Sequence, residues 1–131
     1  MTSLIEDRLA ISELVAAYGD AVSRRDAAAW GATWAADATW NLMGHEMSGR
    51  DAIVVLWLGA MAQFEAVSFI GSIGPISLAG DRATARCQTH EVLRTPDGNV
   101  RRVAGVYDDE FVREAGQWRF ARRCFAIVIE H

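Results

Sequence analysis

The segment "GVYDDEFVREAGQWRFARR", residues 105–123, decides the fold class. Its first half has the alternation typical of a strand, "EAG" marks a turn, and a second strand follows. Similar turn signals stand earlier in the chain, with "GP" at 74–75, "AGD" at 79–81 and "TPDGN" at 95–99. Between them the hydrophobic period is two, which predicts strands over 66–73, 76–79, 82–94, 99–113 and 117–129.

The N-terminal half has helical patterns instead. Ser3 and Glu6 fit a capping box. A buried stripe at helical spacing follows, formed by Ile11, Leu14, Tyr18 and Val22.

Two further helices are predicted from their caps. Asp26 suits the N-cap of a helix over 27–35, and Asp51 that of an apolar, buried helix that ends at Phe64. Between them we expect a short strand over 38–43 and a loop over 44–49. Helices followed by a meander of long strands predict an α+β domain, with the helices on one face of a curved antiparallel sheet.

Composition narrows the function classes. The 131 residues suit one domain, and an apolar fraction of 51% suggests a cavity wall or a subunit interface. A net charge of −4 makes nucleic acid and anionic membranes poor partners. No signal-peptide pattern stands at the N-terminus, so we expect a cytoplasmic protein, in which Cys87 and Cys124 stay free thiols.

Four segments, "WAADATW", "MSGRDAI", "SFIGS" and the 105–123 stretch, resemble the SnoaL-like branch of the nuclear transport factor 2-like superfamily. The resemblance covers nearly the whole chain, so that 1–131 is expected to be a single SnoaL-like domain. It implies a cone, described as a cystatin-like α+β barrel, in which a strongly bent antiparallel sheet is wrapped by three helices around an apolar pocket. Family members include scytalone dehydratases and hexachlorocyclohexane dehydrochlorinases.

Those members use an aspartate–histidine dyad, in which histidine is the base. By resemblance, the histidine position falls on Ser68 and the aspartate position on Ser23. A serine hydroxyl without a neighbouring base does not accept a proton near neutral pH. We therefore expect a pocket that keeps its shape but does not perform histidine-based elimination.

Alternation along 82–94 selects Glu91 as the residue of interest. One face carries Ala83, Ala85, Cys87, Thr89, Glu91 and Leu93, and its small apolar character suits the cavity side. Glu91 is then either an acid or base with a raised pKa, or a carboxylate at the rim in contact with water. His90 points outward by the same alternation, unless a β-bulge turns it into the pocket. His45 is either a surface histidine or part of a loop that closes the mouth of the cone, and the histidine spacing predicts no metal site.

The last strand carries a second candidate. By resemblance, Arg123 matches a catalytic arginine, and the apolar alternation slips near 121–123, which suggests a bulge that turns Arg123 inward. The alternative is a solvated Arg122–Arg123 pair. "DDE" at 108–110 is interpreted as a solvated strand edge.

The remaining candidates follow from the resemblance or from the alternation, with plain core packing as their alternative. Tyr107 is expected to line the pocket and donate to a substrate oxygen. Ligand-binding positions are expected at Tyr18, Ser23, Trp40, Leu42, Phe64, Ser68 and Thr89.

Three functions remain open. The first is a cofactor-independent lyase or isomerase acting on a small apolar oxygenated ring compound, with Glu91, Tyr107 and Arg123 as catalytic residues. The second is a non-catalytic module that binds a small hydrophobic molecule. The third is a cone filled by its own side chains, with a role in association. We also expect a homodimer through the outer sheet face that carries Gln88, His90 and Val92.

Overall fold

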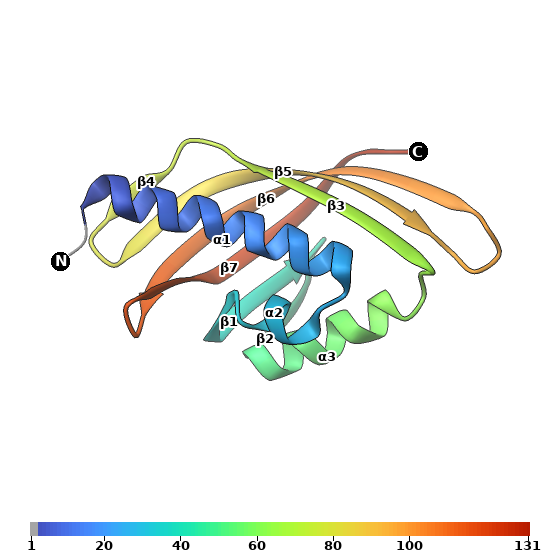
Figure 1. The fold of residues 1–131 in the computed structure, drawn as a ribbon, viewed down its shortest axis with the longest axis horizontal. Helices are drawn as coiled ribbons and strands as arrows, with labels where there is room; N and C mark the ends of the chain where they lie inside the picture. Colours follow the sequence, from blue (N-terminus) through green and yellow to red (C-terminus); the bar gives the residue numbers. More distant parts are fainter. Residues whose placement is uncertain (1–2) are drawn as a thin grey trace.

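The computed structural model describes residues 3–131, and Figure 1 shows its helices packed against one bent sheet. The helices are α1 (Leu4–Arg24), α2 (Ala27–Gly31) and α3 (Arg50–Met61). The strands are β1 (Trp34–Leu42), β2 (His45–Ser48), β3 (Ala66–Ile73), β4 (Ser77–Ala79), β5 (Arg82–Arg94), β6 (Val100–Glu114) and β7 (Gln117–Glu130). The predicted α+β class and the three helices are confirmed.

The sheet is mixed rather than wholly antiparallel. Its order is β2-β1-β7-β6-β5-β3, and β4 pairs with β5. All pairs are antiparallel except β1 with β7, which run parallel. The prediction of a fully antiparallel sheet is wrong at this pair because α3 and five strands separate β1 from β7 in the chain. This long crossover allows the two strands to run in the same direction.

Helix α1 packs along the inner face of the sheet and contacts β3 and β7 (Figure 1). Its predicted cap is confirmed, because the Ser3 Oγ accepts from the Glu6 N–H at 3.1 Å. Ile11, Val15, Tyr18 and Val22 are buried on the side that faces the sheet. Helix α1 therefore covers the inner face and places Tyr18 in the interior.

The helix α3 region differs from the prediction. The segment 44–49 contains the edge strand β2, and α3 begins after Gly49, with Asp51 in its first turn instead of at the cap. Helix α3 is not buried all round, since Val55 is 70% exposed and Leu58 48%. It contacts β1, β2 and α2, so only one of its faces reaches the core.

Helix α2 ends at Gly31, four residues earlier than expected, because Trp34 already belongs to β1. Within residues 3–131, no helix has the length and apolar character needed to cross a bilayer.

Candidate active site in the interior of the cone

The interior is the side of the sheet that faces the helices, and the predicted alternation of β5 is confirmed there. Ala83, Ala85, Cys87, Thr89 and Leu93 are buried, Glu91 is half-buried, and the residues between them are exposed. His90 is among the exposed ones, as alternation predicted. Glu91 lies between Phe69 of β3 and Val103 of β6 in the strand register, with buried hydrophobic side chains on both sides.

Glu91 is the titratable group whose surroundings suit proton transfer. Burial raises the pKa of its carboxyl from the usual 4.5 to about 7, while the charge of Arg101 lowers it by less. Within residues 3–131 its side chain takes part in no hydrogen bond or ion pair described for the structure. Burial is the main reason that the pKa of Tyr18 is raised, and the charge of Glu91 raises it further. Near neutral pH, Glu91 is therefore divided between its acid and base forms.

Arg123 points inward, as the bulge interpretation predicted. The β6–β7 register shifts between Glu110 and Phe111, where Ala121 is the extra residue. Arg123 is 1% exposed and forms a bidentate ion pair with Asp109, with Nε 2.6 Å from Oδ1 and Nη2 3.0 Å from Oδ2. Its guanidinium carbon also lies 4.4 Å from the ring centroid of Tyr18 and 3.8 Å from that of Tyr107.

The alternative of a solvated pair of arginines is therefore wrong for Arg123. Because Asp109 balances the charge and aromatic rings cover the guanidinium, its contacts are with the protein's own side chains. These contacts of Arg123 hold the rings of Tyr18 and Tyr107 in place.

Asp109 was misassigned from the sequence. It is 3% exposed, whereas the "DDE" interpretation placed it on a solvated edge. Asp108 and Glu110 are exposed as expected. The signal was present in the alternation of Tyr107, Asp109 and Phe111, which are all buried on one side of β6.

Tyr18, Trp40 and Tyr107 lie together in an aromatic core. The Trp40 indole Nε1 donates to the Tyr107 hydroxyl at 3.1 Å, and the Tyr18 and Tyr107 rings lie 6.4 Å apart. Burial raises the pKa of both tyrosines, so each hydroxyl keeps its proton at neutral pH. The Tyr107 hydroxyl accepts the hydrogen bond from Trp40 and also interacts with the Tyr18 hydroxyl, which raises the pKa of Tyr107 further and lowers that of Tyr18.

The assignment of Ser68 to the pocket is wrong. Alternation along β3 buries Val67 and Phe69 and leaves Ser68 exposed. Phe69 enters the interior instead, with its ring 5.6 Å from that of Tyr18. A Cβ added at Gly19 would lie 3.2 Å from this ring, so the glycine leaves the space that Phe69 occupies.

Ser23 is exposed. It bonds to the backbone of β3 and does not lie opposite Ser68 across a pocket. Its Oγ accepts from the Phe69 N–H at 2.9 Å and lies 3.3 Å from the Phe69 carbonyl oxygen, to which it donates. Ser23 thus satisfies backbone groups on the open edge of β3. The two serines therefore do not face each other across a pocket. The β3 side chain that points into the interior is Phe69, which has no group that could act as a base.

The other predicted positions are close to the interior. Leu42 and Phe64 are half-buried and pack against the core. Thr89 is fully buried, and its Oγ1 has no hydrogen-bond partner among the described residues. An unpaired buried hydroxyl costs about 1–3 kcal/mol, and Thr89 is 0% exposed.

Among the described residues, neither the cysteines nor a cluster of metal ligands adds a further reactive group to the candidate site. Cys87 and Cys124 are free, and burial raises the pKa of the Cys87 thiol well above its usual range. In residues 3–131, no group of three or more His, Cys, Asp or Glu side chains is placed to hold a metal ion.

These features define a class: an α+β protein in which a bent sheet and three helices enclose one half-buried carboxylate and two neutral tyrosines. The chain belongs to the SnoaL-like domain family, which matches residues 3–124. No curated protein matches it in sequence.

Solved structures share the whole fold at low identity. A protein provisionally assigned as a scytalone dehydratase from Novosphingobium aromaticivorans is 23% identical, with a TM-score of 0.88 over 98% of this chain and 87% of that one. The type 3 hexachlorocyclohexane dehydrochlorinase of Novosphingobium barchaimii is 18% identical, with a TM-score of 0.88 over 97% and 90%. A protein provisionally assigned as an aromatic ring hydroxylase from Novosphingobium aromaticivorans is 25% identical, with a TM-score of 0.85 over 98% and 93%. The fold is therefore that of the nuclear transport factor 2-like proteins, whose solved members include dehydratases and dehydrochlorinases.

Proposed function

We propose that this protein is a cofactor-independent lyase or isomerase that acts on a small, apolar, oxygenated ring compound, with Glu91 as the general base. One observation carries the proposal. Glu91 is a half-buried carboxylate on the interior face, and burial raises its pKa to about 7. A base whose pKa lies near the working pH combines a useful deprotonated fraction with enough basicity to remove a proton.

The surrounding residues support the same chemistry. Glu91 removes a proton from a ring carbon, and a tyrosine hydroxyl donates to the oxygen on which negative charge develops. Tyr107 suits this donation because Trp40 occupies its acceptor side and burial keeps its own proton bound. The Arg123–Asp109 pair acts as a positioning group beneath both tyrosine rings.

The proposed ligand class is based on the side chains near Glu91. Aromatic and aliphatic side chains surround Glu91, and the unpaired hydroxyl of Thr89 lies two positions away on the same face of β5. This combination favours a mostly apolar ring that presents one or two oxygen atoms. The names of the solved neighbours are consistent with ring compounds of this kind.

A non-catalytic binding module is the second candidate. Phe69 favours this second candidate. It occupies the interior position on β3, and its phenyl ring carries no base, although proteins with the same fold include one provisionally assigned as a dehydratase. Such a module would use the same apolar lining and the Thr89 hydroxyl to bind a ring compound without converting it.

The test uses 5-nitrobenzisoxazole, a flat ring whose C–H elimination by a base releases a coloured phenolate. We expect turnover that rises with pH and levels off above about 7, because only the ionised Glu91 accepts the proton. Glu91→Gln should lower this rate by at least about a hundredfold. The matched control is Glu13→Gln, an exposed change on α1 that should leave the rate unchanged.

If the protein binds the probe but shows no turnover that depends on Glu91, the proposed enzyme activity is contradicted and the binding module is supported.

A further inference from the structure

The interior face carries an arginine between two carboxylates, at the end of the sheet near the β5–β6 hairpin. Glu91 of β5 and Glu130 of β7 are the cross-strand neighbours of Val103 on β6, one on each side. A bulge at Val128 puts Glu130 on the same face as the buried Val103. Arg101 lies two residues before Val103 on β6, so its side chain belongs to that face as well.

Arg101 is placed to reach either carboxylate. It is diagonal to Glu91 on one side and to Glu130 on the other, and diagonal positions are about 7–8 Å apart, within reach of a long side chain. Its Nε donates to the Glu130 carboxylate. Its charge also acts on Glu91: burial, the larger effect, raises the pKa of Glu91 to about 7, and Arg101 lowers this pKa by less. Two acidic groups therefore share the influence of one guanidinium.

The other elements that pack against Glu91 supply no competing cation among the described residues. On β3 the residue opposite is Phe69. On α1 the titratable group that interacts with Glu91 is Tyr18, and burial raises the pKa of Tyr18, so its phenol is neutral at neutral pH. Arg101 is thus the charged side chain that acts on Glu91 from the interior face.

Two other arginines lie near the same end of the sheet, and each is bonded elsewhere. Arg25, which follows α1, donates to the Phe64 carbonyl at 2.6 Å. Arg94, at the end of β5, is bonded to the Glu65 carboxylate at 3.0 Å. Neither arginine therefore takes the place of Arg101 beside Glu91.

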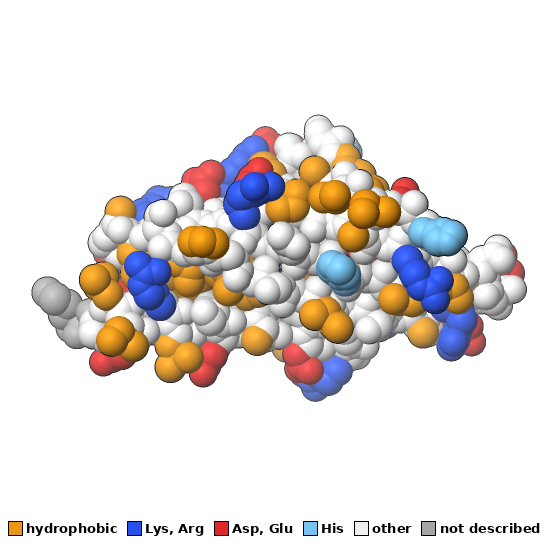
Figure 2. Space-filling model, turned by 90° about the horizontal axis from the view of Figure 1, so that it is seen from above, with side chains coloured by type: hydrophobic (Ala, Val, Ile, Leu, Met, Phe, Trp, Pro, Cys, Tyr) orange, Lys and Arg blue, Asp and Glu red, His pale blue; other side chains and the backbone are white. Residues whose placement is uncertain are grey.

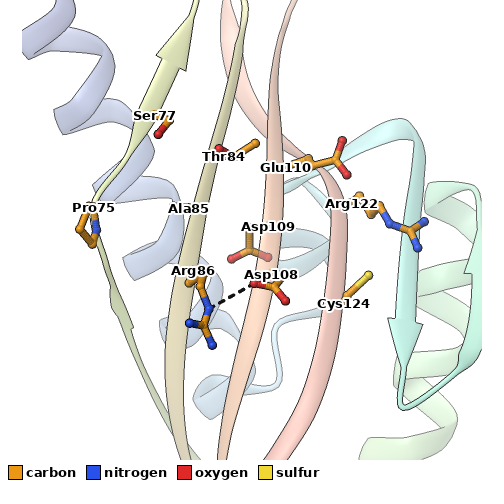
Figure 3. Close-up of a pocket in the computed structure, with 10 residues that line it drawn as sticks. All are labelled: Pro75, Ser77, Thr84, Ala85, Arg86, Asp108, Asp109, Glu110, Arg122 and Cys124. Carbon is orange, nitrogen blue, oxygen red and sulfur yellow. Dashed lines mark ion pairs between the residues drawn. The ribbon is translucent and has the colours of Figure 1, made fainter.

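Charged groups on the outer face are separated from Glu91 by the sheet itself. Seen from the side away from α2 and α3, arginine, acidic and histidine side chains are open to solvent (Figure 2). His90, next to Glu91 in the chain, is exposed on the outer face. Arg86 and Asp108 form a cross-strand ion pair of 3.2 Å there, with both side chains 71% exposed (Figure 3). This outer pair is the natural control for Arg101 and Glu130.

We propose that Arg101 is a positioning residue for Glu91, and that Glu130 competes with Glu91 for its guanidinium. While Glu91 is protonated, Glu130 holds Arg101 at the rim. When Glu91 is ionised, the guanidinium stabilises its carboxylate, and Glu130 limits this stabilisation. The pair of Arg101 and Glu130 is half-exposed and therefore weak, so the two arrangements differ little in free energy. The interior carboxylate thus stays ionisable near neutral pH without a permanent ion pair.

The experiment measures the ionisation midpoint of Glu91 by carbon-13 NMR, and the pH dependence of 5-nitrobenzisoxazole turnover, in the whole chain. Arg101→Gln removes the positive charge and should raise both midpoints by about 0.5 pH units, about threefold in the ionisation constant. Glu130→Gln releases Arg101 and should lower both midpoints by a similar amount. The double variant should resemble Arg101→Gln, because Glu130 acts through the arginine.

Arg86→Gln and Asp108→Asn are the matched controls and should leave both midpoints unchanged, because their ion pair lies on the outer face. A purely structural role would not move the midpoint in opposite directions in the two rim variants. Midpoints that stay unchanged, or that move in the same direction, overturn the proposal. So does a double variant that resembles Glu130→Gln.

The inference rests on the proposed function only where it concerns the rate, because the NMR midpoint is measured without substrate. NMR midpoints that move as expected, in a protein whose turnover does not depend on Glu91, would support the role of Arg101 and contradict the proposed enzyme. Turnover that depends on Glu91, with midpoints unmoved in both rim variants, would contradict the role of Arg101 alone.

Discussion

Replacing Glu91 by glutamine should stabilise the protein at alkaline pH and leave its stability nearly unchanged in acid. Burial raises the pKa of this carboxyl from the usual 4.5 to about 7, so the folded protein holds the proton more tightly than the unfolded chain. The resulting stabilisation is fully present below about pH 4.5 and is lost as the pH rises through about 7. Glutamine has nearly the same size and is never ionised.

The magnitude follows from the size of the pKa change. A rise of about 2.5 corresponds to about 3 kcal/mol of differential stability between the protonated and ionised forms. At about pH 8 the variant should therefore exceed the unchanged protein by up to about 3 kcal/mol in the free energy of unfolding. At about pH 4.5 the two should agree to within about 0.5 kcal/mol.

The assay is urea denaturation of both proteins at these two pH values, with the free energy of unfolding extrapolated to water. Glu13→Gln, at an exposed position on α1, is the control and should show no pH-dependent gap. A gap between Glu91→Gln and the unchanged protein that is the same at both pH values would refute the reasoning. Glu91 would then have the same pKa in the folded and unfolded chains.

Two further predictions concern the interior. Asp109→Asn removes the partner of the buried Arg123 and should destabilise the protein by about 3–5 kcal/mol in urea denaturation; a loss below about 1 kcal/mol would show that the pair is not needed to hold the arginine. Gly105→Ala places a Cβ 2.3 Å from the Phe125 ring and should cost about 1–3 kcal/mol, measured in the same way. Gly59→Ala on α3 is its matched control, because no atom lies within 4 Å of the added Cβ, and it should stabilise the helix by about 0.5–1 kcal/mol. Equal effects of the two glycine changes would contradict the packing described for Phe125.

The parts of the fold that depend on local pattern were predictable from the sequence. Period-two alternation and turn residues located the strands from Ala66 onward, and the slip in alternation located the bulge that turns Arg123 inward. The edge strand β2 was missed, because its four residues pair only with β1 and carry little hydrophobic pattern. The parallel pairing of β1 with β7 depends on contacts between distant segments, which no local pattern encodes.

The site was predictable only where alternation was followed strictly. Glu91 was placed correctly by counting along β5, and the same count along β6 would have placed Asp109 inside. Ser68 was placed by resemblance alone, and an error of one residue moves a strand side chain to the opposite face. The pairing of Asp109 with Arg123 required the register between two strands, which only the structure supplies.

A direct titration of the Glu91 carboxyl tests the proton-transfer proposal most closely. Carbon-13 NMR of the side-chain carboxyl, assigned by loss of its signal in Glu91→Gln, measures the pKa without any substrate. The account predicts a midpoint of about 7 in the folded protein. A midpoint near 4.5, the usual value for this side chain, would show a solvated carboxylate and contradict the assignment of Glu91 as the base.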